Sequence, residues 1–368
     1  MTRRRLLAVA VAAVILLGLG LMVLVGTPEA AEPDLHAPLP VDPNALDLRW
    51  DRERGELVIA YGPIDLPAGA SHEDIVQIGG VVGTLPADGW LHGYRVEITD
   101  AHGRRVPQLV LHHINIIATD RRELFSEIMQ RVGAAGHETG PVKLPRLFGL
   151  PVRQGERLLV TAMMHNPTSE SYEGVRVVTR MPFTPRGTWL PPIPVFPFYL
   201  DVMPPASKHA YDLPPGRSEK SWEGRPAVSG RIIGVGGHLH KYGVALRFED
   251  VTAGKVLWEA APILDEDGNV IGMPMRMFLG RLGIPLRKDH VYRLTAVYDN
   301  PTGETIPDGA MGTLGGVMIP ARNETWPGVD RRRPDYLLDW ELIQDTSYGH
   351  AGRGEGSATA GGHGHHHH

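Results

Sequence analysis

The sequence predicts an all-β fold made of β-sandwiches or jelly rolls. Its 368 residues include 44 glycines and 32 prolines, a composition that favours many short strands and turns over long helices. Short apolar runs are broken by turn signals about every eight to twelve residues, which is the spacing typical of sandwiches and jelly rolls. The length suits two domains or one large all-β unit.

Strand-like runs fill most of the first half of the chain, from about Leu46 onward. In Gly93–Thr99 apolar and polar residues alternate, as expected for a strand with one buried face. One helix is predicted at Asp120–Val132, because Asp120 and Glu123 form a capping-box pattern, apolar residues share a face and a glycine follows. The runs interpreted as strands are ELVIAYG, IVQIGGVVG, WLHGYRVEITD, PQLVLHHINII, RLLVTAMMHN and EGVRVVTRM.

A proline-rich run, residues 182–205, separates these strands from a second set. It carries eight prolines in twenty-four positions. Because proline lacks a backbone N–H donor, the run is predicted to be a stiff, partly buried connection and not a central strand. The strands after it are RIIGVGGHLHKYGVALRFED, GKVLWEAAPIL, NVIGMPMRMFL, HVYRLTAVYDN and GAMGTLGGVMIP.

The two ends of the chain differ from the rest. Arg3, Arg4 and Arg5 precede twenty uncharged residues, Leu6–Val25, long enough to cross a bilayer with the arginines on the cytoplasmic side. This segment is predicted to be an uncleaved membrane anchor or a cleaved signal peptide, and either places the remainder outside the cytoplasm. The tail 346–368 is of low complexity, and its terminal HGHHHH can bind divalent metal by itself.

Composition excludes several classes of function. The chain has no cysteine, so disulfides, thiolate metal sites and a cysteine nucleophile are excluded. A formal charge of −5 without a basic stripe argues against nucleic-acid binding. Hydrolase and nucleotide-binding motifs are missing from the sequence.

Histidines are the most informative residues. Eight of them lie near turns, prolines or charges and are expected to be solvated: His36, His72, His92, His102, His137, His209, His290 and His350. Five others stand inside strand-like runs: His112, His113, His165, His238 and His240.

His238 and His240 lie on either side of one leucine. On a strand, residues i and i+2 leave the same face about 6.6 Å apart, so two neutral imidazoles there could bind one metal ion. The alternative is two histidines on a wet sheet face. His112 and His113 are adjacent, and neighbouring side chains on a regular strand diverge, so joint binding requires a bulge or a strand end. Otherwise one ring is buried and the other exposed. His165 taken alone fits a core histidine as well as a ligand.

Taken in order, these residues resemble a known family. His-His in LVLHHINII, a single histidine before Asn-Pro in LLVTAMMHNP, His-x-His in GGHLHKYGVALR and a methionine in GAMGTLGGVMIP follow one another. This order is similar to that of the copper type II, ascorbate-dependent monooxygenases, which include peptidylglycine α-hydroxylating monooxygenase and dopamine β-monooxygenase. The resemblance spans about residues 45–325.

The resemblance implies two jelly-roll domains in tandem, each presenting one copper ion across a solvent-filled cleft. His112, His113 and His165 would hold the electron-transfer copper. His238, His240 and Met311, with Met318 as the alternative, would hold the copper that binds O₂, where a soft thioether favours Cu(I). Together with the features of the sequence itself, this predicts an anchor or signal (1–26), a linker (27–45), an N-terminal domain (46–185), a connection (186–205), a C-terminal domain (206–345) and a flexible tail (346–368).

The chain also departs from the family pattern. The peptide-amidating branch has an arginine two residues before His-x-His, where this chain has Gly236, and polar partners where it has Thr313 and Gly315. A grip on a substrate carboxylate is therefore not expected. A separate run, Met273-x-Met275-x-Met277, either binds Cu(I) or fills the core.

We expect an extracytoplasmic copper monooxygenase (an oxidoreductase) that uses O₂ and a small reductant such as ascorbate to hydroxylate a C–H bond of an unidentified substrate. The alternative is a non-catalytic protein that stores or delivers copper on the same scaffold. A third reading is a structural or carbohydrate-binding jelly roll with incidental histidines.

Overall fold

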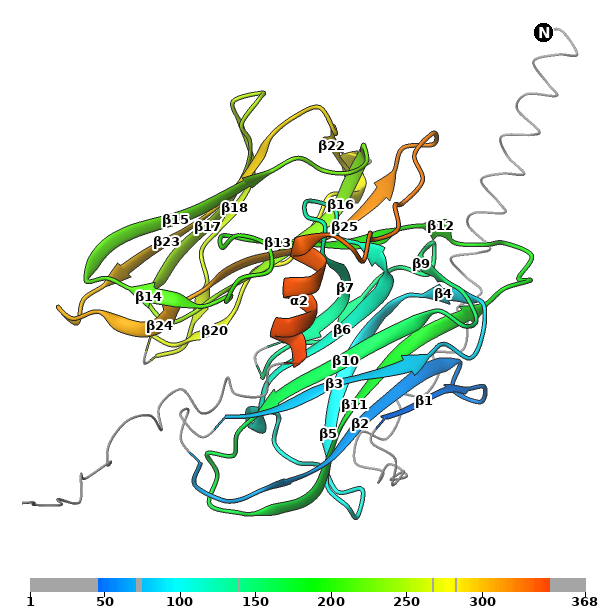
Figure 1. The fold of residues 1–368 in the computed structure, drawn as a ribbon, viewed down its shortest axis with the longest axis horizontal. Helices are drawn as coiled ribbons and strands as arrows, with labels where there is room; N and C mark the ends of the chain where they lie inside the picture. The colour runs from blue at the N-terminus through cyan, green and yellow to red at the C-terminus, as the bar shows by residue number, and fades with distance from the viewer. Residues whose placement is uncertain (1–45, 71–74, 138, 267, 282, 345–368) are drawn as a thin grey trace, which may run out of the picture. The chain divides into compact units, whose positions relative to one another are not determined.

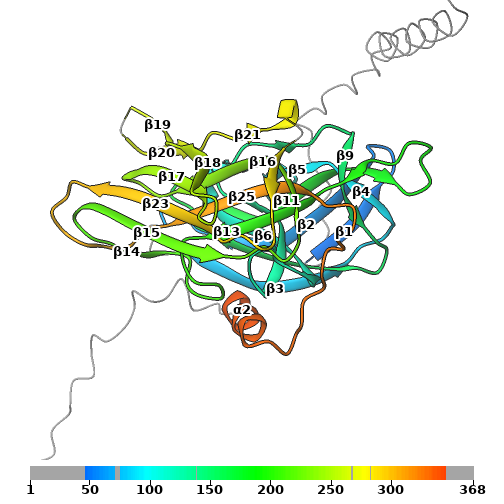
Figure 2. The same ribbon diagram turned by 90° about the horizontal axis from the view of Figure 1, so that it is seen from above.

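A computed structural model describes residues 46–344 apart from 71–74, 138, 267 and 282. All of them belong to one compact unit, residues 40–368. The described part is all-β, with many strands and a single α-helix, as the sequence predicts (Figures 1 and 2). The predicted anchor, linker and tail lie outside the described residues. None of the helices among the described residues has the length and apolar character needed to cross a membrane.

The strands form two successive groups, which we call the N-terminal half (β1–β12) and the C-terminal half (β13–β25). The N-terminal half comprises β1 (Leu46–Asp51), β2 (Glu56–Leu66), β3 (Val76–Thr84), β4 (Gly89–Leu91), β5 (Gly93–Thr99), β6 (Leu111–Arg122), β7 (Met129–Ala135), β8 (Val142–Lys143), β9 (Phe148–Val152), β10 (Arg157–Met164), β11 (Tyr172–Pro185) and β12 (Ile193–Pro194).

The C-terminal half is built in the same way from its own strands. They are β13 (Phe196–Asp201), β14 (Tyr211–Leu213), β15 (Gly216–Gly224), β16 (Gly230–Leu239), β17 (Gly243–Asp250), β18 (Lys255–Ala260), β19 (Ile263–Leu264), β20 (Val270–Gly272), β21 (Arg276–Met277), β22 (Ile284–Leu286), β23 (Tyr292–Asn300), β24 (Ile306–Ala310) and β25 (Gly312–Pro320).

Each half contains two large sheets. In the N-terminal half, β1-β2-β11-β4-β9-β12, with β5 and β8 attached, forms one sheet, and β3-β10-β6-β7 forms the other. In the C-terminal half the sheets are β13-β25-β16-β21, with β22 attached, and β15-β23-β17-β18. The pairs β14-β24 and β19-β20 form small separate ribbons.

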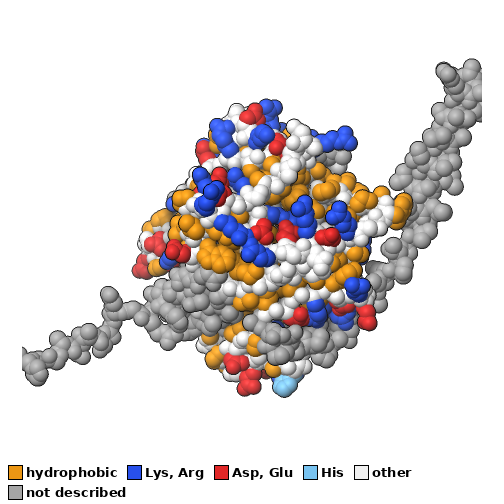
Figure 3. All heavy atoms as spheres, turned by 45° about the vertical axis from the view of Figure 1, so that its right-hand side comes forward, with side chains coloured by type: hydrophobic (Ala, Val, Ile, Leu, Met, Phe, Trp, Pro, Cys, Tyr) orange, Lys and Arg blue, Asp and Glu red, His pale blue; other side chains and the backbone are white. Residues whose placement is uncertain are grey.

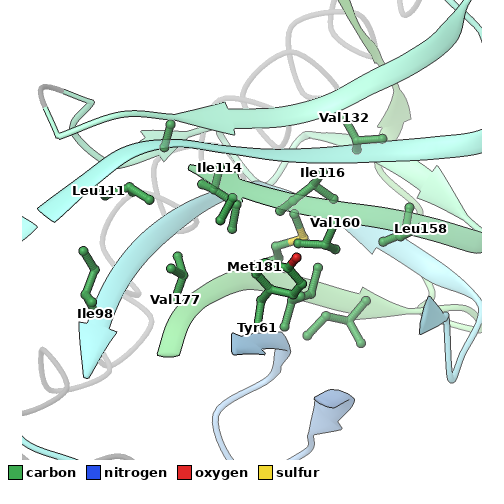
Figure 4. Close-up of a cluster of buried hydrophobic side chains, with 14 of the residues drawn as sticks. Tyr61, Ile98, Leu111, Ile114, Ile116, Val132, Leu158, Val160, Val177 and Met181 are labelled. Carbon is green, nitrogen blue, oxygen red and sulfur yellow. The ribbon is translucent and has the colours of Figure 1, made fainter. Parts of the chain in front are cut away.

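Each half also has a hydrophobic core of its own. In the N-terminal half, Leu111, Ile114 and Ile116 of β6 face Val177 and Met181 of β11 (Figure 4). The core of the C-terminal half gathers buried side chains of β13, β16, β17, β23 and β25, which include Phe198, Val235, Phe248, Leu294 and Leu314.

The two halves share one strand order. To compare them, we number the main strands of each half from first to eighth in chain order. Each of the pairs β4/β5, β8/β9 and β21/β22 counts as one interrupted strand, and the edge strands β1 and β12 and the two ribbons are left out. In each half, the order of neighbouring strands is then first-eighth-third-sixth in one sheet and second-seventh-fourth-fifth in the other.

A matching turn follows the seventh strand in each half. Asn166-Pro-Thr-Ser-Glu170 follows β10, and Asn300-Pro-Thr-Gly-Glu304 closes β23. In both turns the buried asparagine accepts hydrogen bonds from the threonine N–H and hydroxyl, and donates from its amide to the glutamate carbonyl. The repeated turn and strand order indicate that one scaffold is used twice.

The predicted helix at Asp120–Val132 is wrong. β6 continues to Arg122, and β7 begins at Met129. Leu124 and Phe125 pack into the core of the C-terminal half, whereas Met129 packs into a separate cluster under the C-terminal helix. The apolar spacing therefore reflects burial in two different places and not one helical face.

The helix of the structure lies elsewhere. α2 (Pro334–Gln344) packs on the N-terminal half, where Tyr336 joins a cluster with Ile117 and Leu159. Asp339 is 2% exposed and pairs with Arg131, whose nitrogen lies 2.5 Å from its carboxylate.

The proline-rich run is also more regular than predicted. β11 includes Pro182 and Pro185 and lies between β2 and β4, so its prolines end a central strand. Farther along, β13 forms the edge of its sheet and pairs only with β25 there. The prediction of a connection without a central strand is therefore wrong for the start of this run.

Candidate metal centre

A β-bulge brings His112 and His113 together. In the pairing of β6 with β10, His113 lies opposite Met163, but Leu111 lies opposite Met164, so His112 is an extra residue. The ring centroids are 4.3 Å apart, and the two Nδ1 atoms are 2.7 Å apart. The sequence required a bulge for joint binding, and the structure has one.

His165 follows the neighbouring strand β10. Its backbone N–H donates to the carbonyl of Val110 at 3.1 Å, and the turn that begins at Asn166 fixes the chain directly after it. Its ring centroid lies 6.1 Å from that of His112, and its Nδ1 atom is shielded from solvent. The three histidines of the N-terminal half therefore come together at one end of β6 and β10.

His238 and His240 lie at the end of β16. Val235 and Leu239 point into the core of the C-terminal half, so His238 leaves the opposite face of the strand. The two ring centroids are 5.3 Å apart, as the i, i+2 spacing predicts. The Nε2 atom of His238 is shielded from solvent.

The two histidine groups meet. The rings of His113 and His238 are 5.8 Å apart, so the five rings form one continuous group, which we call the histidine cluster. This distance is shorter than the solvent-filled cleft implied by the family resemblance would allow. Burial lowers the pKa of His113 well below its ordinary value, and the nearby rings of His112, His238, His240 and His209 lower it further. The neutral imidazole keeps a lone pair available for a metal ion.

Tyr298 ties together the two segments of the C-terminal half that carry the candidate ligands His240 and Met311. Its hydroxyl oxygen accepts the backbone N–H of His240 at 2.9 Å and that of Met311 at 3.0 Å, and it donates to the carbonyl of Met311. Burial raises the pKa of Tyr298 to about 12, so the hydroxyl keeps its proton. The structure thus brings the backbone of Met311 beside His240.

Met318 lies elsewhere. It is fully buried in the core of the C-terminal half, opposite Ile232 on β16, whereas His238 is opposite Thr313. Its side chain occupies the face of the sheet that points away from the histidine cluster. The structure therefore does not bring Met318 and the histidines together.

Sequence reasoning missed a second thioether. Met163 is the cross-strand partner of His113 and is partly buried beside it. The signal was the i, i+2 spacing of Met163 and His165 in one strand-like run.

It also missed a polar group next to the cluster. Asp201 lies in the same cross-strand row as Thr313 and His238. The Asp201 carboxylate accepts hydrogen bonds from the Tyr199 hydroxyl and, at 2.9 Å, from His209. His209 is exposed, as expected, and it is also a partner of this buried carboxylate.

Two of the histidines expected to be solvated, His92 and His290, are buried or partly buried instead. His92 is 3% exposed, donates from Nδ1 to the carbonyl of Phe148 and accepts from the Thr184 hydroxyl. His290 is bonded to the carboxylate of Asp250 at 2.8 Å. Both have structural partners away from the cluster.

The donors suit copper. Imidazole binds copper in both oxidation states, and a thioether such as Met311 or Met163 favours Cu(I). Among the described residues, no three or more His, Cys, Asp or Glu side chains converge closely enough to hold a metal ion by themselves. The closest approach is the His112–His113 pair, whose two Nδ1 atoms point at one small region.

Comparisons with known proteins do not identify a family. No protein-family model matches the chain, and no curated protein matches it. Among solved structures, the VP2 subviral particle of infectious bursal disease virus aligns over 79% of this chain and 76% of its own, with 12% identity and a TM-score of 0.24. The Gx strain of the same virus aligns over 81% and 78%, with 12% identity and a TM-score of 0.24. Such scores carry no argument about fold or function.

Proposed function

We propose that the protein is an extracytoplasmic copper monooxygenase related to the copper type II, ascorbate-dependent family. The observation that carries this proposal is the histidine cluster. Five imidazoles from two separate halves meet in one place, and a bulge at His112 directs two adjacent rings toward each other. Incidental histidines on a structural sandwich have no reason to be arranged in this way.

The proposal includes two tandem jelly-roll domains with the predicted boundaries, 46–185 and 206–345. The strand order supports it, because eight strands in two sheets, ordered first-eighth-third-sixth and second-seventh-fourth-fifth, wind as in a jelly roll. The repetition of this order in both halves also fits a tandem arrangement.

In this proposal His112, His113 and His165 hold the electron-transfer copper, and His238, His240 and Met311 hold the copper that meets O₂. The bound copper ions supply one-electron transfer and O₂ activation. The protein supplies the ring nitrogens and the thioether, and Tyr298 fixes the spacing between the segments of His240 and Met311. Asp201 places a buried carboxylate in the cross-strand row of His238.

The surface next to His238 bears on the substrate. Gly236 and Gly315 are cross-strand partners, and a Cβ added at Gly315 would have no atom within 4 Å. The sheet surface is thus open at Gly315, and neither glycine supplies the arginine that grips a carboxylate in the peptide-amidating branch. We therefore propose a substrate other than a peptide with a free carboxylate.

The location follows from the N-terminal segment, which we propose to be a membrane anchor or a cleaved signal peptide. The chemistry then takes place outside the cytoplasmic membrane, with O₂ and a small reductant such as ascorbate as co-substrates. No nucleic-acid partner is proposed, and on the face seen in Figure 3 positive and negative side chains are interspersed.

The direct test is O₂ uptake. It uses the full-length chain with His350, His363 and His365–His368 replaced by alanine, which we call the tail-substituted protein, so that tail-bound metal does not contribute. Copper-loaded protein should consume O₂ when ascorbate is added, and His238→Ala should not. Tight binding of copper without any reductant-dependent uptake, over a broad range of C–H substrates, would favour the copper carrier instead.

A copper carrier remains the second candidate because of one specific observation. Met275 and Met277 are 66% and 45% exposed. Met277 belongs to β21, which pairs with β16, the strand that carries His238. Exposed thioethers are unusual for core filler and are suited to exchanging Cu(I).

A further inference from the structure

We propose that Met275 and Met277 form an exposed Cu(I)-binding site that captures copper and passes it along β16 to His238. The binding of Cu(I) by the two methionines stands on its own geometry. The delivery step rests on the proposed copper function of the histidine cluster.

Two glycines of β16 make room for the two methionines. β21 pairs with β16, with Met277 opposite Gly234, and the strands lie side by side in Figure 2. A Cβ added at Gly234 would meet the Met277 sulfur at 2.6 Å. One added at Gly236 would meet the side chain of Met275, with Cγ at 3.0 Å and the sulfur at 3.8 Å. Both thioethers therefore lie directly on the surface of this strand.

The same face of β16 leads to the histidine cluster. The pairing of β16 with β25 is regular from Gly234 to Leu239, so Gly234, Gly236 and His238 share one face. Successive residues on one face of a strand are about 7 Å apart. Met277, Met275 and His238 thus mark three positions at roughly equal steps.

Exposure and chemistry separate these methionines from the others near the cluster. Met275 is 66% and Met277 45% exposed, whereas Met318 is fully buried and Met273 packs partly against the core. An exposed methionine contributes little packing energy, so core filling does not explain this pair. Thioether sulfur is a soft ligand that selects Cu(I) over harder divalent ions.

Transfer from this site is a ligand exchange. Copper remains Cu(I) throughout, the Cu–S bonds to Met275 and Met277 break as Cu–N bonds to imidazole form, and no electron is gained or lost. Because the oxidation state of copper does not change, the exchange requires no oxidant or reductant.

The binding test separates the two sites by using Ag(I), a soft and redox-inert substitute for Cu(I). The protein is the tail-substituted chain in which His112, His113, His165, His238 and His240 are also alanine. It should bind about one equivalent of Ag(I), with sulfur scattering in X-ray absorption. Met275→Leu combined with Met277→Leu should abolish this binding, and Met203→Leu, which removes a thioether elsewhere, should not. Circular dichroism and thermal melting confirm that the leucine variants are folded.

The delivery test keeps the histidine cluster intact. Loaded with Cu(I) from a chromophoric chelator, the double leucine variant should bind about one ion fewer in total. Its histidine cluster should fill to the same final extent as in the parent, but about tenfold more slowly, because the methionines no longer raise the local concentration of copper near His238. No Ag(I) binding in the cluster-free protein, or equal loading rates, would overturn the proposal. Ag(I) bound by the methionines, together with a histidine cluster that takes up no copper, would instead refute the proposed function and leave the methionine site standing.

Discussion

The two halves share a strand order and a turn, yet they carry their histidines on different sheets. In the N-terminal half the histidines lie on β6 and directly after β10, in the second-seventh-fourth-fifth sheet. In the C-terminal half they lie at the end of β16, in the first-eighth-third-sixth sheet. These two sheets adjoin, since Gln130 of β7 donates from Nε2 to the carbonyl of Pro197 of β13 at 2.8 Å. The difference teaches that a repeated scaffold can bring histidines of both copies into one cluster when each copy uses the sheet that adjoins the other.

The repeated turn makes the same point at a single position. The residue before Asn166 is His165, which belongs to the histidine cluster, whereas the residue before Asn300 is Asp299, which is exposed. One turn therefore holds a candidate ligand, and its counterpart only closes a strand.

The largest effect is expected from removing histidines of one half at a time. His238→Ala in the tail-substituted protein should abolish ascorbate-dependent O₂ uptake and reduce bound copper from about two ions to about one, because the C-terminal copper loses one of its three proposed donors. His112→Ala combined with His165→Ala should remove the other copper. Copper content is measured by atomic absorption after dialysis.

The control is His290→Ala, since His290 is a partly buried histidine of the C-terminal half bonded to Asp250 and not to the cluster. It should keep both ions. If any single-half variant lost all copper, the assignment of one ion to each half would be contradicted.

The junction between the halves should respond to pH through Glu123. Its buried carboxylate accepts backbone N–H groups from Leu124, Arg131 and, across the junction, Tyr199. Burial raises the pKa of Glu123 from 4.5 to about 7, although these hydrogen bonds and Arg131 act in the opposite direction. The stability that this group contributes is thus complete below pH 4.5 and is lost as the pH rises to about 7.

The expected loss in the free energy of unfolding is about 3 kcal/mol over that range. Urea unfolding at several pH values measures it. The slope should disappear in Glu123→Gln, whatever the absolute stability of that variant, and an unchanged slope would show that Glu123 does not titrate there.

The repeated turn offers a matched pair of substitutions. Asn166→Ala and Asn300→Ala each remove a buried amide, 1% exposed in both cases, from the same set of hydrogen bonds. Each should lower the free energy of unfolding by about 2–3 kcal/mol. Only Asn166→Ala should also weaken copper binding, because only it releases His165. Equal copper affinities in the two variants, measured by chelator competition, would contradict the different roles of the two turns.

A smaller effect is expected at Tyr298. Tyr298→Phe leaves the N–H groups of His240 and Met311 without their acceptor and should cost about 1–3 kcal/mol of stability. It should also weaken Cu(I) binding in the C-terminal half, because the two ligand segments are no longer held together. Tyr292→Phe is the control, since Tyr292 is equally buried on the same strand and accepts only the N–H of Arg287. If both variants bound Cu(I) alike, Tyr298 would have no positioning role.

The sequence predicted the all-β fold class and the local arrangement of several histidines. Alternation and turn spacing indicated the strands, and the bulge at His112 was a stated requirement for joint binding by two adjacent rings. The i, i+2 spacing placed His238 and His240 on one face because a strand repeats every two residues. Each of these features depends only on residues that are close together in the sequence, so the spacing of those residues is enough to predict it.

Features that depend on contacts distant in sequence were missed. Leu124 and Phe125 imitate a helical face, but they are buried in the core of the other half. α2 gave no periodic signal, since Leu337 and Leu338 are 54% and 47% exposed while Asp339 is buried against Arg131. The approach of His113 to His238 depends on how the halves adjoin, which no local spacing encodes.

The most direct test of the central claim is electron paramagnetic resonance of the tail-substituted protein loaded with Cu(II), combined with a copper count. The proposed function predicts about two ions per chain. Because the nearest rings of the two halves are 5.8 Å apart, these ions should be close enough to give a half-field signal and less spectral intensity than two independent ions. Two ions with full, independent intensity would contradict a joint cluster, and a chain that binds no copper would contradict the copper function itself.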